Sequence, residues 1–423
     1  MNAKSVSRII SATQASLLLG LLTLGRDVEA QSVLAPTPEF SITPPAVVQY
    51  QANSQMEVFS PPDIVTHPDE PPLRWGPVTL RPHAFYRFLY GTGLLAAGTN
   101  HVDSTIQEFS PGLLFGIGSH WTLDYTPTWR FYSSDQFRNT LDHNVRLIGG
   151  TEYEDWFFGL SQTYDRSSQT LIETGTQTDQ QTYSTTLNAS YQFNSKMSLD
   201  AAVNQNISSA EQFQNSIEWS TSDWLNYQFW PRLNAGLGVT FGYVDVETGS
   251  DMTYERFQGR INWRATDKFS LQVHGGMEAR QFLGIDADGV LNPVVGGVIQ
   301  YQPFDFTRLS LNVDRAVATS LLTTNSQSQL TESTSFTGHL NQRLFKKVYL
   351  DLDGGYHTVT YVAATTAATD RKDDYYTFNA RLSYPFLKRG TVAAFYQYSD
   401  NSSTIESFTY SSSQVGFEVG YRF

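Results

Sequence analysis

The chain contains no cysteine among its 423 residues. This absence excludes disulfide bonds, thiolate metal sites and lipoprotein acylation, so backbone hydrogen bonds and burial must stabilise the fold. Charged residues make up only 16%, and the net charge of −13 argues against a nucleic-acid partner, which would require a basic surface. Beyond the N-terminal leader, no segment approaches the ~18 uninterrupted apolar residues that a membrane-spanning helix needs.

Aromatic and uncharged polar residues take the place of the missing charges. Aromatic residues make up 14% of the chain, yet the mean hydropathy is −0.32 because Ser, Thr, Asn and Gln are abundant. This mixture is typical of a wide membrane β-barrel, in which one face of each strand contacts lipid and the other contacts water.

Residues 1–30 have the pattern of a secretory signal peptide. Lys4 and Arg8 form a positive start, residues 15–25 form a short apolar core, and Val28-Glu29-Ala30 places small residues before a cleavage site at Gln31. The apolar core is too short to span a membrane as a helix. We expect the mature chain to begin at Gln31 and to cross a membrane with strands.

Residues 31–75 are rich in proline, which removes hydrogen-bond donors and favours extended conformations. We expect a Pro-rich periplasmic arm that is either a disordered tether or a docking segment and partial plug. The second alternative is favoured by apolar side chains in this stretch. Nine of the 17 prolines lie here: Pro36, Pro38, Pro44, Pro45, Pro61, Pro62, Pro68, Pro71 and Pro72.

Residues 76–423 alternate between apolar and polar residues, and short turns alternate with longer polar loops. This pattern predicts an all-β transmembrane, antiparallel, up-and-down barrel of about 18 strands, with 16–20 as the range. The weakest predicted strand, 213–229, is overlong and carries Asp223 on its lipid side. The predicted strands are 78–90, 105–118, 121–132, 141–153, 156–166, 181–193, 197–207, 213–229, 233–246, 253–265, 269–280, 291–302, 306–318, 330–344, 347–363, 373–386, 390–399 and 407–423.

The last segment, 411–423, has apolar residues at every second position and ends on Phe423. It resembles the closing strand of outer-membrane barrels, in which a terminal aromatic residue is the insertion signal. Tyr421 and Phe423 are therefore the predicted assembly signal, engaged by the barrel assembly machinery. The alternative is an ordinary half-buried strand of a soluble sheet.

Charged residues at inward positions are expected to line an aqueous lumen. Arg256, Arg260 and Arg264 form a column on one strand and would favour anions. The alternative is that these charges pair across strands and only keep the wall polar. The predicted pore-lining residues are Arg130, Arg146, Arg256, Arg260, Arg264, Glu278, Arg280, Asp351, Asp353 and Arg381.

Signals for catalysis, metals and cofactors are weak. The eight histidines are scattered and none belongs to a nucleophile motif, so we expect no enzyme and no cofactor. Residues 286–289 (DADG) resemble part of a calcium loop but lack its third oxygen ligand and closing Glu.

The segments FSPGLLFGIGSHWTLDYTPTWRFY (109–132) and SQVGFEVGYRF (413–423) carry a resemblance to the β-barrel porin 2 group of outer-membrane proteins, often found beside exopolysaccharide export systems. The resemblance implies a barrel in the outer membrane of a diderm bacterium, in contact with lipid and lipopolysaccharide, and suggests polysaccharide transport. Two functions stay open. One is a pore for polar solutes, including saccharides or anions, and the other is a non-conducting barrel that contacts periplasmic export proteins through residues 31–75.

Overall fold

The computed structural model describes residues 73–97, 100–211, 213–284, 289–320, 330–362, 371–387 and 389–422. The predicted signal peptide, nearly all of the predicted arm, Phe423 and most of the calcium-like DADG segment lie outside these residues. Within them, no helix is long and apolar enough to cross a membrane.

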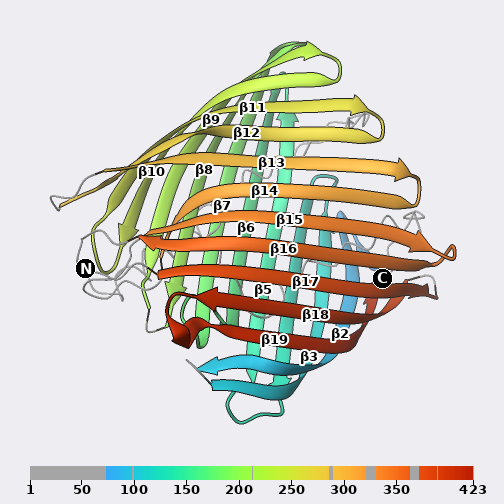
Figure 1. Cartoon of the computed structure of the whole chain (residues 1–423). Coiled ribbons are helices and arrows are strands. Elements are labelled where there is room, and N and C mark those ends of the chain that lie inside the picture. Colours follow the sequence, from blue (N-terminus) through green and yellow to red (C-terminus); the bar gives the residue numbers. More distant parts are fainter. Residues whose placement is uncertain are drawn as a thin grey trace. The chain divides into compact units, whose positions relative to one another are not determined.

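The described residues form a sheet of antiparallel strands joined in chain order (Figure 1). A single short 3-10 helix, η1 (Glu406–Phe408), interrupts them within the described part of the chain. The strands are β1 (Leu73–Trp75), β2 (Val78–Ala97), β3 (Asn100–Ile117), β4 (Trp121–Tyr132), β5 (Thr140–Tyr153), β6 (Trp156–Thr170), β7 (Gln177–Asn194), β8 (Met197–Ala210), β9 (Ser216–Trp230), β10 (Leu233–Val246), β11 (Met252–Thr266), β12 (Phe269–Phe282), β13 (Val290–Phe304), β14 (Thr307–Thr319), β15 (Leu330–Leu344), β16 (Val348–Val362), β17 (Arg371–Phe386), β18 (Gly390–Ser403) and β19 (Tyr410–Arg422).

The sheet closes on itself because the last strand pairs with the second. β19 pairs antiparallel with β2 from Ser413 opposite Thr92 to Arg422 opposite His83. The short strand β1 pairs with the next residues of β2, from Leu73 opposite Leu80 to Trp75 opposite Val78. Strands β2 to β19 therefore form a closed barrel of 18 strands, and β1 covers the part of β2 that β19 does not reach.

The period-two pattern of each strand sets which side chains face outward. On β19, Val415 and Phe417 are 54% and 45% exposed on the outer face, whereas Gln414 and Glu418 on the inner face are 4% and 7% exposed. Aromatic side chains on the outer face gather near both strand ends, where amphipathic rings suit the lipid headgroup boundary. Trp219 and Tyr227, on the two halves of β9, are 48% and 44% exposed.

The predicted all-β barrel of 18 strands is confirmed, and its predicted short turns are confirmed at the same positions. The structure corrects several strand ends. The stretch 91–104 was predicted as a loop, but β2 extends to Ala97 and β3 begins at Asn100. The reason is that Leu94 and Leu95 are buried inside the barrel, each 2% exposed. The sheet also begins at Leu73, three residues before the predicted boundary of the barrel.

Asp223 lies on the outer face of β9, as its sequence position predicts. The weakest predicted strand is therefore a single strand, and the strand count does not change. Asp223 pairs in register with Ala201 and Val239 on the neighbouring strands. The pairing of β9 with β10 instead shifts its register between Leu233 and Asn234 of β10.

Because a carboxylate in the apolar band is unfavourable, we expect Asp223→Val to increase the free energy of unfolding by about 1 kcal/mol. Urea unfolding in lipid vesicles measures this change. Asp267→Val, in an exposed turn, is the control and should leave stability unchanged; equal effects of the two substitutions would contradict the lipid-facing position.

The two ends of the lumen differ in packing. At the long-loop end, apolar side chains fill the interior in clusters, the largest being Val244, Val246, Met252, Tyr254, Val317 and Leu330, each at most 6% exposed. Toward the short-turn end, most inward side chains are at least partly accessible, and several at the strand ends, such as Arg264, Arg308 and Arg343, are exposed. The interior is therefore packed toward the loops and open toward the turns.

Candidate functional site

A tight hairpin tip between β6 and β7, Leu171–Thr176, lies inside the lumen; we call it the strap. Its turn is closed by backbone hydrogen bonds from Leu171 N to Thr176 O and from Gly175 N to Leu171 O, at 3.2 and 2.8 Å. Gly175 has φ +68°, a conformation that glycine adopts without strain. Leu171, Ile172 and Glu173 are 2%, 3% and 9% exposed, so the strap is packed and not solvated.

Arg371, the first residue of β17, holds the strap by its backbone. Its guanidinium donates hydrogen bonds to the carbonyl oxygens of Glu173 at 2.8 Å and Ile172 at 3.0 Å. Asp373 accepts two further hydrogen bonds from this guanidinium, at 2.5 and 3.0 Å. Arg371 also lies 3.4 Å from the ring centroid of Phe408. With 4% exposure, this arginine is fixed by partners on every side.

Two other contacts hold the strap to the same wall. The carboxylate of Glu173 accepts a hydrogen bond of 2.6 Å from Ser320, the residue after β14. Ile172 packs with Leu95, Tyr375 and Tyr410 in one buried cluster. Six strands separate β7 from β14, and six separate β6 from β17 around the other side. The strap therefore crosses the lumen to the opposite wall.

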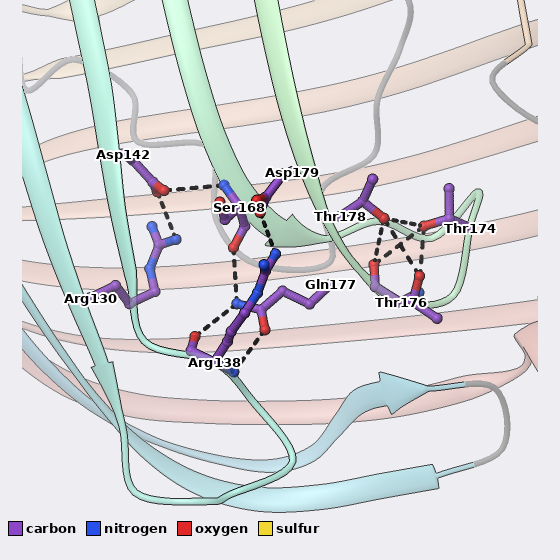
Figure 2. A network of polar contacts seen from close by, with 9 residues as sticks. All are labelled: Arg130, Arg138, Asp142, Ser168, Thr174, Thr176, Gln177, Thr178 and Asp179. Carbon is purple, nitrogen blue, oxygen red and sulfur yellow. Dashed lines mark hydrogen bonds and ion pairs between the residues drawn. The ribbon is translucent and has the colours of Figure 1, made fainter. Parts of the chain in front are cut away.

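The base of the strap is braced by the loop between β4 and β5, as Figure 2 shows. Gln177 accepts a hydrogen bond from Arg138 N at 2.9 Å and donates to Arg138 O at 3.0 Å. The same side chain donates to Ser168 O at 3.1 Å, and Asp142 accepts the Ser168 N–H at 3.1 Å. Arg138 also forms an ion pair with Asp179. These contacts fix the angle at which the hairpin enters the lumen.

Below the strap, an ionic ladder of alternating sign follows the inner wall. Arg130 contacts Glu108 at 2.6 Å and Asp142 at 2.9 Å. On the other side of the closing seam, Arg381 contacts Glu418 at 2.5 Å and Asp351 at 3.4 Å. Arg87 connects the halves, since it lies 3.8 Å from Glu418 and opposite Glu108 in register. The ladder runs Asp351, Arg381, Glu418, Arg87, Glu108, Arg130 and Asp142.

The opposite part of the wall carries two further arginine clusters. Arg256 and Arg280 both contact Glu278, at 2.5 and 2.8 Å. Tyr254 lies beside this group and donates a 2.5 Å hydrogen bond to Glu218. The ring of Tyr254 covers Gly242, whose added Cβ would lie 2.2 Å from it. The sequence places glycine here because the neighbouring ring needs that space.

Arg260 is held by an aromatic ring and a carboxylate. Its guanidinium lies 4.3 Å from the ring centroid of Trp224 and 2.8 Å from the carboxylate of Asp200. Trp224 lies over Gly238, where a Cβ would be 2.4 Å from the indole. This stacking orients Arg260 along the wall toward Asp200 and not across the lumen.

At the short-turn end, arginines on the inner face are exposed. We call Arg264, Arg308, Arg343 and Arg422 the arginine arc. The pairing registers place Arg308 opposite Asn341, Arg343 opposite Tyr349 and Arg422 opposite His83, all on inward positions. Each lies within three residues of a strand end, and all four are exposed. The arc lines half of this opening, from β11 to β19.

All the predicted pore-lining residues lie at inward positions, but most of them are paired with another side chain of the wall. Arg146 and Arg264 are the exceptions, since both are exposed. The pairs support the alternative in which wall charges neutralise one another across strands. Ion pairs hold Arg130, Arg256, Arg260, Glu278, Arg280, Asp351 and Arg381. The carboxylate of Asp353 lies 2.5 Å from Nδ1 of His339.

The sequence did not reveal the strap or Arg371. The available signal was the apolar pair Leu171–Ile172 within 167–180, a stretch otherwise polar and predicted as a loop. Tyr421, of the predicted assembly signal, lies on the outer face and is 37% exposed. No group of three or more metal-ligating side chains is present among the described residues.

Residues 252–423 match the family model described as Putative beta-barrel porin 2. The predicted resemblance to this family is therefore confirmed over the part of the barrel from β11 to β19. Among curated proteins, none matches the chain in sequence.

Solved outer-membrane proteins are similar in structure at low identity. Acinetobacter baumannii OccAB4 is 13% identical with a TM-score of 0.46, covering 81% of this chain and 98% of its own. Pseudomonas aeruginosa OpdO is 13% identical with a TM-score of 0.45, covering 81% and 97%. Pseudomonas aeruginosa OccK2 (OpdF), solved in complex with glucuronate, is 11% identical with a TM-score of 0.45, covering 82% and 98%.

The chain is a closed antiparallel β-barrel of the outer membrane, and its residues 252–423 are similar to a porin family. In such barrels the short turns face the periplasm and the long loops face outside. The strap therefore lies at the extracellular end of the lumen, and the arginine arc lies at the periplasmic end.

Proposed function

We propose that this protein conducts small polar solutes across the outer membrane through a lumen that the strap narrows. The observation that carries the proposal is the strap, held across the lumen by Arg371 and Ser320. A barrel of 18 strands has an aqueous interior unless something fills it. Solutes that cross the lumen must pass beside this hairpin, so we expect it to limit their size.

The chemical class of solute follows from the exposed part of the wall. The buried charges form ion pairs within the wall and contribute little field, and the side chains of the arginine arc are exposed at the periplasmic opening. Rings of Arg and Lys select anions in pores, so small anions and acidic saccharides are the solutes that this opening favours.

Planar-bilayer recording tests the proposal. We expect stable channels of low conductance, whose current falls when polar solutes small enough to enter the passages beside the strap are added, and changes little with larger ones. Complete silence, both with residues 31–72 and without them, would support a non-conducting partner of an export system instead.

Charge selectivity should depend on exposed and not on paired arginines. In protein lacking residues 31–72, Arg264→Gln with Arg343→Gln should lower the ratio of anion to cation permeability by roughly twofold at low salt, since screening limits the field to about 8 Å at physiological salt. Reversal potentials measure this ratio.

The matched control is Arg256→Gln with Arg260→Gln, which removes the same charge from paired positions. We expect it to leave selectivity unchanged and to reduce stability, because Glu278, 1% exposed, loses one of its two cations. A larger change in selectivity from the control pair would contradict the proposal that the arginine arc sets the charge selectivity.

A further inference from the structure

A small cavity lies between the strap and the wall that holds it. It leaves about 10 Å³ open to the centre of a water-sized particle, which is room for one water molecule or one small ion. The seven residues that line it are all at most 9% exposed, so the cavity is shielded from bulk water. The strap supplies Ile172 and Glu173, and strands β16 to β18 supply Val359, Tyr361, Asp373, Tyr375 and Asn401.

One polar atom of this lining lacks a hydrogen-bond partner among the described residues. Asn401 is 0% exposed, and its Nδ2 donates a 2.7 Å hydrogen bond to the carbonyl oxygen of Phe408. This bond fixes the orientation of the amide, because the reverse orientation would set two carbonyl oxygens against each other. Oδ1 is therefore the atom that the amide offers to the cavity, and no donor of the described residues reaches it. A buried acceptor of this kind requires a donor or a cation.

The charges of the site favour a cation over a water molecule. Two carboxylates, those of Glu173 and Asp373, belong to the lining. Arg371 pairs with Asp373 and binds the backbone carbonyl of Glu173, so two carboxylates and one guanidinium leave an excess of one negative charge. Ionised carboxylates and amide oxygens only accept hydrogen bonds, and a water molecule has two donors for these three groups. One positive ion is attracted by all three and balances the excess charge.

Ligand type, space and charge determine the class of ion. The three groups offer oxygen atoms, which hard cations prefer, and the described lining contains no histidine or cysteine for a transition metal. Mg²⁺ keeps several of its water molecules, and the cavity has no room for them. An excess of one negative charge matches a monovalent ion better than Ca²⁺. Na⁺ is the smaller of the two common monovalent cations.

We propose that one Na⁺ ion binds between the strap and the wall, held by Glu173, Asp373 and Oδ1 of Asn401. Glu173 belongs to the strap, whereas Asp373 and Asn401 belong to β17 and β18. The site is complete only while the strap is docked, so the ion stabilises the docked position by mass action. The inference rests on the strap of the proposed function, but it concerns what holds the strap, and its test requires no conduction.

The reactivity of a thiol on the strap measures docking directly. Leu171→Cys places this thiol at a position that is 2% exposed and packs with Ala210 outside the cavity lining, in a chain with no native cysteine. In the folded, lipid-embedded protein, a water-soluble maleimide should react about fivefold more slowly in NaCl than in N-methylglucamine chloride, as expected when Na⁺ is at about four times its dissociation constant. The organic cation is too large for the cavity, and equal ionic strength keeps screening the same.

Two substitutions that remove one carboxylate each separate the site from general electrostatics. Glu173→Gln removes a carboxylate of the cavity but keeps an oxygen for the hydrogen bond from Ser320, and it should abolish the difference between the two salts. Asp374→Asn, the matched control, removes a carboxylate of the outer face that lies 3.4 Å from Lys372, and it should preserve the difference. An equal loss in both variants would overturn the proposal.

A series of cations identifies the occupant in the Leu171→Cys protein alone, so it decides the question even if Glu173→Gln fails to fold. We expect KCl to slow the reaction less than NaCl, and CaCl₂ at equal ionic strength to protect no better than NaCl. Stronger protection by Ca²⁺, equal rates in NaCl and N-methylglucamine chloride, or a rate that depends on pH but not on Na⁺ would each overturn the proposal. Protection by Na⁺ with unchanged conductance of Arg371→Ala would support the ion site and contradict only the proposed function.

Discussion

Replacing Arg371 with alanine is expected to increase the single-channel conductance several-fold and to make the current fluctuate. The substitution removes both hydrogen bonds to the strap backbone and leaves Asp373, 2% exposed, without its cation. Two hydrogen bonds from a charged donor contribute about 3 kcal/mol or more, which shifts the equilibrium between docked and undocked strap by roughly 100-fold. Planar-bilayer recordings at fixed voltage measure the change.

The matched control is the adjacent residue on the outer face. Lys372 is half exposed, with 51% of its side chain accessible, and pairs with Asp374 outside the lumen. Lys372→Ala should therefore leave the current unchanged. If Arg371→Ala conducts like the unmodified protein while the barrel remains folded, the strap does not limit conduction.

Replacing Arg130 with methionine is expected to reduce the free energy of unfolding by about 3–5 kcal/mol. The reason is that Glu108 and Asp142, 4% and 7% exposed, would keep buried charges without their common partner. Because Asp142 also binds the backbone of Ser168, the base of the strap should loosen as well. Chemical unfolding in lipid vesicles, followed by tryptophan fluorescence, gives the stability.

Two comparisons separate a buried network from ordinary surface pairing. Arg138→Met breaks an ion pair whose arginine is 52% exposed. It should therefore reduce the free energy of unfolding by no more than about 1 kcal/mol. The triple variant Glu108→Gln, Arg130→Met, Asp142→Asn removes all three charges together and should recover much of the loss. If Arg130→Met and Arg138→Met reduced the free energy of unfolding equally, the buried ion pairs of the ladder would contribute no more than a surface ion pair.

The barrel could be predicted because membrane strands follow one simple rule. Lipid on one side and water on the other impose a period of two on every strand, and short turns such as Thr266–Lys268 interrupt it at regular intervals. Asp223 broke the rule locally without shifting its neighbours, so the count of strands was correct. The strand ends were less predictable, since Leu94 and Leu95 extend β2 by packing against distant parts of the chain.

The strap could not be predicted because it, too, is held by contacts between distant parts of the chain. Leu171 and Ile172 stand in a polar loop, and no local pattern shows that Ser320 and Arg371 will meet that loop across the lumen. Period two places Arg256 and Arg260 on the inner face, but their neutralisation depends on Glu278, on the neighbouring strand, and on Asp200, three strands away. Local periodicity determines which way a residue faces, and contacts between strands determine whether its charge remains available.

The most direct test of the account is to lock and release the strap in a single channel. Ile172→Cys with Tyr375→Cys places two thiols within one packed cluster, in a chain with no other cysteine. In the Arg371→Ala background, the account predicts a low, steady current while the disulfide is oxidised and a several-fold larger, fluctuating current after reduction. The same current in both states would contradict the claim that the strap controls passage through this barrel.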